Sequence, residues 1–420
     1  MKITDQIKET GRAVMVLVRW IILGVITGLI VGITGTAFHY CTEILAEARS
    51  ENKWIIFLMP VCGIFIVWLY KKCDMSNDKG TNAVLLAVRE DEVLPLKTAF
   101  LIFISTVVTH FAGGSSGREG AALQIGGSIA AAEGKLIHLD EKDKKIIIMS
   151  GMSACFSALF GTPVTAAFFS IEVISVGIMH YSAIVPCVIS SLTAYEAAHF
   201  CGVIPTSFSI SMVPELKPDM IFRVIPFAAA CAVIARLFCF CMQSAARLFR
   251  KYFRNEYIRV CAGSVIIIVM TLIAGSQTFN GTGNEIIAKS FFHRSEFYLF
   301  IVKILFTAIT LGCGFKGGEI IPAFFVGSTF GSFLGPLFGI DYSFGAGTGL
   351  IALFCAVTNC PITSIIMSTE LFGLQSIPLF ALVCGISYLI SGDTGLYADQ
   401  KIMYSRTKPV YVNKVLKKRS

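Results

Sequence analysis

The sequence predicts an all-helical, multi-pass membrane protein built from two inverted repeats with broken, re-entrant helices. Hydrophobic residues make up 55% of the 420 residues and charged residues only 15%, whereas roughly a quarter of the residues of a soluble domain are charged. Two glycine-rich turns, at 113–120 and 312–322, interrupt the apolar segments. The residues around these two turns match one another in order, which indicates an internal repeat.

The charge and cysteine patterns exclude other classes of protein. The net charge of +8 comes from Lys and Arg at the ends of the chain and between the apolar segments. This is the distribution that the positive-inside rule gives a protein in a lipid bilayer, so we expect no nucleic-acid partner. The fourteen cysteines lie mostly inside apolar runs, and no two CxxC pairs match. We therefore expect no metal site, no disulfide framework and no cofactor.

The first half of the chain opens with an unusually long apolar segment, 14–45. It exceeds the roughly 20 residues that a span needs, so it should be tilted or extend into the membrane interface. Thr81 or Asn82 is the expected N-cap of a helix that follows a polar stretch. Three further apolar segments are expected in this half: 54–70, 99–111 and 181–200.

The helix that begins at Glu119 is expected to stop near Ala132, as half of a broken helix. A charged loop is expected at 135–145. Two short apolar pieces hinged at 161–163, where glycine and proline occur together, should follow this loop.

Three prolines within 202–219 mark the connection between the two halves. Beyond this connection we expect three spans, at 220–246, 260–275 and 297–311. Several short apolar pieces should follow, up to Gly392. We therefore divide the chain into a first inverted half (1–210), a second inverted half (211–405) and a basic cytoplasmic tail (406–420).

A shift of 200 residues superposes the first glycine turn on the second. The matched pairs are Gly114 with Gly314, Gly117 with Gly317, and Glu119 with Glu319. Further on, a proline is followed nine residues later by a glutamate in both halves, at 163–172 and at 361–370. Repeats whose corresponding segments are short and interrupted by Gly or Pro are typical of inverted-repeat transporters, which bind their substrate near the midplane between half-helix ends.

Helix N-termini are the candidate anion-binding elements, because their unpaired N–H groups carry partial positive charge. Three candidate N-termini lie near Thr81-Asn82, near Glu119 and near Ile320-Ile321. The Arg118–Glu119 pair is costly in an apolar segment unless the site handles ions. The carboxylate of Glu119 would occupy the anion site and leave it on protonation, so one side chain would be both gate and proton carrier. The simpler alternative is that Glu119 only caps its helix.

The motif Gly117-Arg118-Glu119-Gly120 resembles the GREGP motif of the CLC chloride channels and proton-coupled antiporters. The paired proline-to-glutamate segments fit the inverted halves of that family, so the resemblance covers nearly the whole chain. It implies that Glu119 is the gating glutamate and that Tyr397 closes the central anion site. It also implies a homodimer with a separate pore in each subunit.

The Lys-Gly-Gly-Glu turn that ends at Glu319 looks like the fluoride-exporting branch of the CLC family. Members of that branch exchange fluoride for protons without the inner glutamate of the chloride antiporters, whose position is taken here by Val173. The chain departs from the branch at two positions. Thr81 stands where methionine is usual, and Ile321 stands where threonine is usual.

We therefore expect a secondary active transporter rather than an enzyme, exporting fluoride in exchange for protons across the plasma membrane, with both termini cytoplasmic. The expected anion-binding residues are Thr81, Asn82, Gly117, Arg118, Gly120, Glu319, Ile320, Ile321 and Tyr397. A protonated Glu319 could donate a hydrogen bond to fluoride, whose binding requires donors in place of water. The alternative for Glu319 is a salt bridge to Lys316 or Arg118.

Three other functions compete with this one. A chloride/proton antiporter and a passive anion channel would share the same fold. The third comes from another class, because 114–117, Gly-Ser-Ser-Gly, matches the GxSG of rhomboid intramembrane proteases. Such a protease would pair the serine of the motif, Ser116, with a histidine of a later span, such as His180 or His199.

Overall fold

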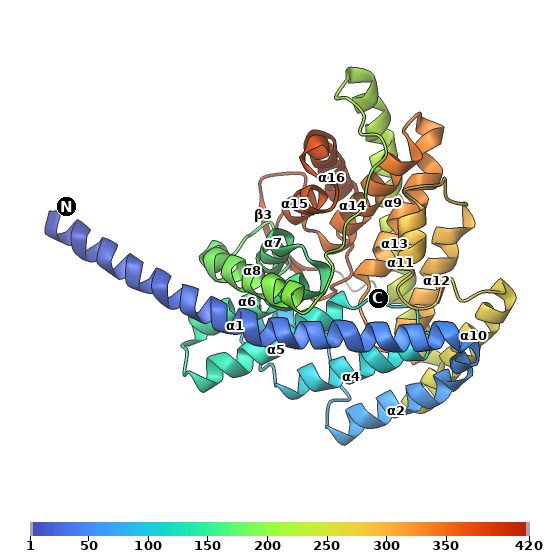
Figure 1. The fold of residues 1–420 in the computed structure, drawn as a ribbon, viewed down its shortest axis with the longest axis horizontal. Coiled ribbons are helices and arrows are strands. Elements are labelled where there is room, and N and C mark those ends of the chain that lie inside the picture. The colour runs from blue at the N-terminus through green and yellow to red at the C-terminus, as the bar shows by residue number, and fades with distance from the viewer. Residues whose placement is uncertain (1–2, 417–420) are drawn as a thin grey trace.

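The computed structural model describes residues 3–416, and most of them are helical (Figure 1). The helices of the first half are α1 (Ile3–Glu51), α2 (Met59–Lys72), α3 (Thr81–Glu90), α4 (Lys97–Phe111), α5 (Glu119–Leu136), α6 (Glu141–Phe160), α7 (Pro163–Glu172) and α8 (Ile184–Phe200). Those of the second half are α9 (Pro218–Tyr252), α10 (Glu256–Ala274), α11 (Asn284–Lys289), α12 (Tyr298–Cys313), α13 (Ile320–Leu334), α14 (Tyr342–Thr358), α15 (Pro361–Phe372) and α16 (Ile377–Ser391).

The two series of helices correspond in order. Each begins with a long helix, α1 of 49 residues and α9 of 35 residues. In each series a glycine turn precedes the fifth helix, and the seventh helix begins at a proline. The expected helical architecture with a repeated half is thus confirmed.

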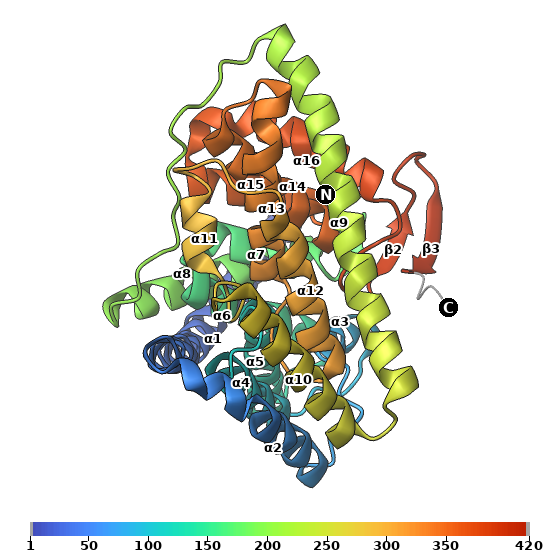
Figure 2. The same cartoon turned by 90° about the vertical axis from the view of Figure 1, so that its right-hand side faces the viewer.

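Long apolar helices form the outside of the molecule. Among the described residues, six helical segments have the length and hydropathy to cross a membrane, including Glu9–Glu51, Lys53–Lys72 and Pro218–Tyr252. The helix α1 extends beyond the rest of the molecule at its N-terminal end (Figure 1), and α9 runs along the opposite side (Figure 2). Many large apolar side chains of α1 are exposed, as contact with lipid requires.

The centre consists of two tightly packed helix pairs, α5 with α6 and α13 with α14. Glycine permits the close approach in both pairs. A Cβ atom at Gly126 would lie 2.0 Å from the carbonyl oxygen of Gly151, and one at Gly331 would lie 2.1 Å from that of Gly345. Small residues at helix contacts are the usual means of packing in membranes, where van der Waals contact replaces the hydrophobic effect.

Two glutamates join the halves reciprocally. Glu172, at the end of α7, accepts hydrogen bonds from the backbone N–H groups of Ile362 (3.1 Å) and Thr363 (2.7 Å) at the start of α15. Glu370, in α15, accepts the corresponding bonds from Val164 (2.9 Å) and Thr165 (2.7 Å) at the start of α7. Each carboxylate satisfies N–H groups that a helix start leaves unpaired. The repeated Pro-to-Glu spacing is therefore a pair of inter-half caps.

Three local predictions were wrong. Gly80, at φ +59°, is the N-cap of α3, and the side chains of Thr81 and Asn82 do not cap it. The helix that begins at Glu119 continues four residues beyond Ala132, to Leu136. The expected charged loop at 135–145 is largely helical, because Asp140 accepts hydrogen bonds from the N–H groups of residues 142 and 143 and starts α6.

A small sheet, which the sequence analysis did not predict, lies near the C-terminal end of the described chain (Figure 2). Its strands are β1 (Ser175–Val176), β2 (Lys401–Tyr404) and β3 (Tyr411–Val415), in the order β1-β2-β3. The strand β2 pairs in parallel with β1, directly after α7, and antiparallel with β3. The described part of the basic tail is thus attached to the helical body.

Candidate functional site

The two glycine turns meet back to back. The backbone N–H of Gly117 donates to the carbonyl oxygen of Gly318, and the N–H of Gly318 donates to that of Gly117, both at 2.7 Å. A Cβ atom at Gly318 would lie 2.8 Å from the backbone nitrogen of Glu119, so this contact requires glycine. The N-termini of α5 and α13 consequently start beside one another, although about 200 residues separate them in the sequence.

The side chain of Glu119 lies between these two N-termini and is fully buried. Its Oε1 accepts a hydrogen bond from the N–H of Arg118 (3.0 Å), and its Oε2 accepts one from the N–H of Ile321 (3.3 Å). The carboxylate therefore crosses from the start of one half-helix to the start of the other. This is the position in which paired helix N-termini favour a small anion.

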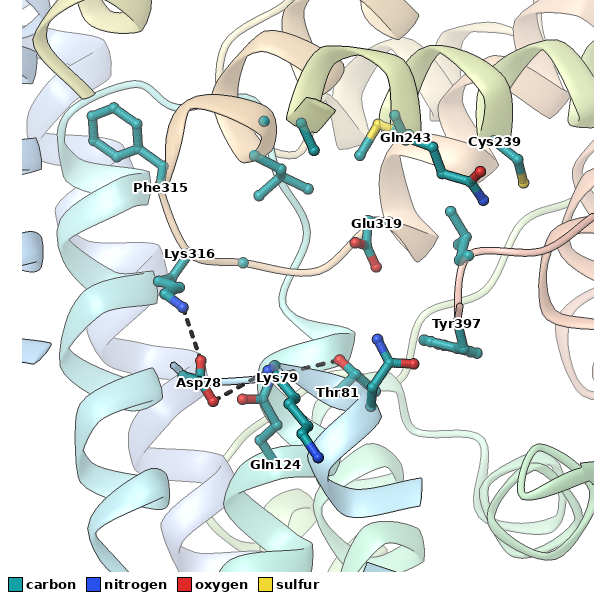
Figure 3. Close-up of a pocket in the computed structure, with 18 of the residues that line it drawn as sticks. Asp78, Lys79, Thr81, Gln124, Cys239, Gln243, Phe315, Lys316, Glu319 and Tyr397 are labelled. Carbon is teal, nitrogen blue, oxygen red and sulfur yellow. Dashed lines mark hydrogen bonds and ion pairs between the residues drawn. The ribbon is translucent and has the colours of Figure 1, made fainter. Parts of the chain in front are cut away.

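A cavity of about 290 Å³ lies beside this junction (Figure 3). Five of its polar lining residues come from four different segments: Thr81, Asn82, Gln124, Glu319 and Tyr397. The hydroxyl of Tyr397 is buried and has no hydrogen-bond partner among the described residues. Glu319 and Tyr397 both line the cavity, from two different segments of the chain (Figure 3). The arrangement offers hydrogen-bond donors to a small ion.

Glu319 is the N-cap residue of α13, but its side chain makes no capping hydrogen bond. The salt bridge considered for it is also not formed. The Nζ of Lys316 pairs with the Oδ2 of Asp78 at 2.8 Å (Figure 3). The Nη1 of Arg118 donates to the Nδ1 of His39 (3.2 Å) and the Oγ1 of Thr42 (3.1 Å). The carboxyl group of Glu319 is left to face the cavity.

Thr81 and Asn82 reach the cavity from the start of α3 and contact different neighbours. The Oγ1 of Thr81 donates to the carbonyl oxygen of Gly120 (3.4 Å). The Oδ1 of Asn82 accepts a hydrogen bond from the N–H of Asp399 (3.2 Å). Asn82 thereby joins the start of α3 to the segment that carries Tyr397.

Gln124 is a cavity residue that the sequence analysis missed. Its Nε2 donates to the carbonyl oxygen of Gly120 (3.0 Å) and to the Oγ1 of Thr81 (3.5 Å), while its Oε1 has no partner among the described residues. The signal was present in the spacing, since Gln124 lies four residues after Gly120 and therefore on the same face of α5.

The remaining expected site residues divide between the two sides of the junction. Gly117 forms the backbone bridge, and Gly120 packs against Thr81. Ile320 and Ile321 are buried, and only the N–H of Ile321 reaches Glu119. Arg118 points away from the first cavity and lines a second one. The junction thus has a separate cavity on each side.

The two serines of the GxSG match have other surroundings. The Oγ of Ser115 lies 3.0 Å from the Oγ1 of Thr307, and its N–H donates to Thr310. The Oγ of Ser116 has no hydrogen-bond partner in the part of the chain that the structure describes. Neither serine is paired with His180 or His199.

This geometry agrees with comparisons to known proteins. Residues 62–392 match the family model described as voltage gated chloride channel, which is most of the chain. The chain belongs to this family, the CLC family. The CLC family consists of channels and transporters, so the protease alternative is wrong and the chain is not an enzyme.

Individual CLC proteins resemble the chain over nearly its full length. A chloride/fluoride channel protein of Pseudomonas syringae pv. tomato is 31% identical over 395 residues, covering 92% of this chain and 87% of the relative. An H+/Cl− exchange transporter of Vibrio cholerae is 24% identical and covers 83% of the chain and 81% of the relative. The crystal structure of a CLC-type fluoride/proton antiporter superposes with a TM-score of 0.87 at 29% identity, covering 91% of this chain and 97% of that one.

Proposed function

We propose that this CLC protein exports fluoride in exchange for protons, with Glu119 as both gate and proton carrier. One observation carries the proposal: the carboxylate of Glu119 accepts hydrogen bonds from the N-termini of both half-helices, at Arg118 and Ile321. An ionised carboxylate competes with an anion for these groups. Protonation removes its charge and frees the N–H groups, so uptake of a proton by Glu119 permits an anion to bind where the carboxylate was.

The preference for fluoride is supported by the relatives and by the chemistry of the first cavity. A relative named as a chloride/fluoride channel and a solved fluoride/proton antiporter both resemble the chain. Fluoride is small and strongly hydrated, so a site must replace its water with hydrogen-bond donors. The hydroxyl of Tyr397 lies at the cavity without a hydrogen-bond partner among the described residues, and a protonated Glu319 adds another donor.

The route proposed for protons uses Glu119 and Glu319 within the anion pathway. Residue 173 is a buried valine, so it cannot carry a proton on the inner side. Its neighbour Glu172 is held by the N-terminus of α15 through Ile362 and Thr363. A carboxylate held in this way serves as a cap, which leaves the two glutamates of the glycine turns as the exchangeable carriers.

The proposal extends to the assembly of the protein. By the family resemblance, the chain forms a homodimer in the plasma membrane, with one pathway in each subunit and both termini cytoplasmic. The first cavity then opens to the cytoplasm and the second to the outside. The inverted halves comprise 1–210 and 211–405, with a basic cytoplasmic tail at 406–420.

A chloride/proton antiporter is the second candidate. It is favoured by the hydroxyl side chain of Thr81, which lines the first cavity where the fluoride-exporting branch usually has methionine. The related H+/Cl− exchange transporter of Vibrio cholerae also supports this candidate.

Ion efflux from proteoliposomes tests the proposal and separates it from both alternatives. Liposomes loaded with fluoride or chloride are diluted into ion-free buffer, and anion efflux and external pH are recorded together. The proposal predicts fluoride efflux that raises the external pH, and little chloride efflux. Equal efflux of the two anions with a pH change would indicate the chloride antiporter, and efflux without a pH change would indicate a channel.

A further inference from the structure

The segment that carries Tyr397 to the first cavity, 395–400, belongs to no helix or strand. It lies between α16, which ends at Ser391, and β2, which begins at Lys401. A residue on such a segment keeps its position only where other parts of the chain hold it. Because Tyr397 is only 2% exposed and lines the cavity, the contacts of this segment determine where its ring lies.

Gln400 anchors this segment from inside the protein. Its side chain is fully buried, and the carbonyl oxygen and the nitrogen of its amide both have partners. The Oε1 accepts a hydrogen bond from the Nδ2 of Asn359 (2.9 Å), and the Nε2 donates to the carbonyl oxygens of Val173 (2.9 Å) and Thr358 (3.0 Å). A side-chain amide has two N–H donors, so both are used here. Because Val173 follows α7 and Thr358 ends α14, Gln400 joins the segment to both halves.

The backbone of Gln400 connects this anchor to Tyr397. The N–H of Gln400 donates to the carbonyl oxygen of Tyr397 (3.0 Å), and the carbonyl oxygen of Gln400 accepts a hydrogen bond from the N–H of Leu416 (3.0 Å), directly after β3. On the other side of the tyrosine, the N–H of Leu396 donates to the carbonyl oxygen of Val357 (2.9 Å). Tyr397 therefore lies between two anchored residues, and a shift of Gln400 would move it.

Asn359, the side-chain partner of Gln400, is itself held by Arg406. Asn359 ends α14 with φ +64°, and its Oδ1 accepts a hydrogen bond from the Nη2 of Arg406 (2.7 Å), which follows β2. The Nη1 of Arg406 donates to the carbonyl oxygen of Tyr388 (2.7 Å), and its Cζ lies 4.4 Å from the centre of the Tyr388 ring. Gly395 permits the close packing, since a Cβ atom there would lie 2.6 Å from the Nδ2 of Asn359. A continuous chain of hydrogen bonds thus runs from Arg406 through Asn359 to Gln400.

We propose that Gln400 is a positioning residue of the anion site: its buried amide holds Tyr397 at the first cavity and thereby sets the affinity for the transported anion. The inference rests on the proposed function, in which the hydroxyl of Tyr397 donates to that anion. Gln400 is not among the residues that line the first cavity, so it acts through the tyrosine and not by touching the ion. A residue that holds a binding group in place affects anion binding more than the maximal rate, so its loss should raise KM.

Fluoride efflux from proteoliposomes loaded with increasing concentrations of fluoride gives KM and the maximal rate, and so tests this role. Gln400→Met keeps the length of the side chain but removes its amide. The KM of this variant should exceed that of the wild type by about fivefold to tenfold, while the maximal rate should change by less than about twofold. In the Tyr397→Ala background the same substitution should change KM little, because the ring that Gln400 positions is absent.

Glu370→Ala is the matched control. It removes hydrogen bonds between α15 and α7 but none of the segment 395–400, so its KM should equal that of the wild type. Two results would overturn the proposal: an unchanged KM in Gln400→Met, or a KM shift of the same size in the wild-type and Tyr397→Ala backgrounds. A loss of stability alone does not imitate the expected effect, because it lowers the amount of active protein and hence the maximal rate.

A second variant keeps the proposal testable if Gln400→Met does not fold. Gln400→Glu retains the acceptor for Asn359 but places an oxygen against the carbonyl groups of Val173 and Thr358, so the same rise in KM is expected and an unchanged KM counts against the proposal. The outcome is separable from that of the proposed function. If the wild-type protein carries chloride instead of fluoride, the proposed function is wrong, and the same series measured with chloride still tests Gln400.

Discussion

Two pairs of glutamates recur in the two halves, and they behave differently. Glu119 is the first residue of α5, whereas Glu319 is the N-cap residue of α13, one position earlier relative to its helix. Glu172 and Glu370, at the ends of the proline-led helices, make reciprocal contacts, since each caps the start of the other's helix. Glu119 and Glu319, at the glycine turns, do not. Glu119 reaches across to the N–H of Ile321, whereas Glu319 makes no such bond and faces the first cavity.

The difference separates the scaffold from the proposed transport site. The proline-led helices keep the symmetry of the repeat because both carboxylates do the same structural work, which is to satisfy helix N–H groups across the boundary between the halves. The glycine turns keep the symmetry only in the backbone, through the bridge between Gly117 and Gly318. Glu119 follows its glycine of the bridge by two residues and Glu319 by one, so that one carboxylate lies at the helix ends and the other lies at the cavity.

Removing the structural glutamates should have the largest effect on stability. Glu172→Ala leaves the N–H groups of Ile362 and Thr363 without their acceptor in a buried setting, which should cost about 3 kcal/mol. Glu370→Ala removes the matching bonds at a less buried position and should cost about 1–2 kcal/mol. Reversible unfolding in mixed micelles measures both values. No loss of stability in either variant would contradict the assignment of these residues as inter-half caps.

The glutamate at the cavity should affect transport more than stability. Glu319→Gln keeps the shape of the side chain and a hydrogen-bond donor but cannot take up or release a proton, so proton-coupled fluoride efflux should fall by about tenfold or more. The melting temperature should change little. Glu92→Gln is the matched control, because Glu92 is exposed and pairs with Lys79 instead. If Glu319→Gln exchanges fluoride for protons at the wild-type rate, Glu319 is not a proton carrier.

The ion pair of Lys316 and Asp78 should have the smallest effect. Lys316→Met leaves the carboxylate of Asp78, whose side chain is 2% exposed, without its cation. Because the lysine side chain is 25% exposed, we expect a loss of only about 1–2 kcal/mol. A double variant with Asp78→Asn should recover part of this loss, since it removes the unpaired charge. Additive losses in the double-mutant cycle would show that the two residues do not stabilise each other.

The sequence was informative wherever a single residue type determines the local structure. Glycine and proline residues predicted where the turns and the proline-led helices lie. The glutamates that recur beside them predicted the repeat. The glycine turn before Glu119 predicted that this residue lies at the start of a helix. Tyr397 lines the first cavity, and its role in closing the anion site stays a prediction. These features depend on short stretches of sequence.

Features that depend on contacts between distant segments could not be predicted in this way. Lys316 and Asp78 are 238 residues apart, and Arg49 meets a segment 228 residues away at Gln277. Both pairings follow from the packing of the two halves. The N-cap of α3 is Gly80 and not Thr81, because the chain has a positive φ at this position, which glycine adopts readily. The sequence analysis had relied instead on the usual preference for a side chain that caps the helix.

The most direct test of the central claim compares wild-type protein with Glu119→Gln in fluoride-loaded proteoliposomes, recording fluoride efflux and external pH together. The amide cannot take up and release a proton. If Glu119 is the gate and the proton carrier, the variant should lose proton uptake to the level of protein-free liposomes, and any fluoride efflux that remains should leave the pH unchanged. Continued proton uptake with fluoride efflux in Glu119→Gln would contradict the account, because the proton would then have another carrier.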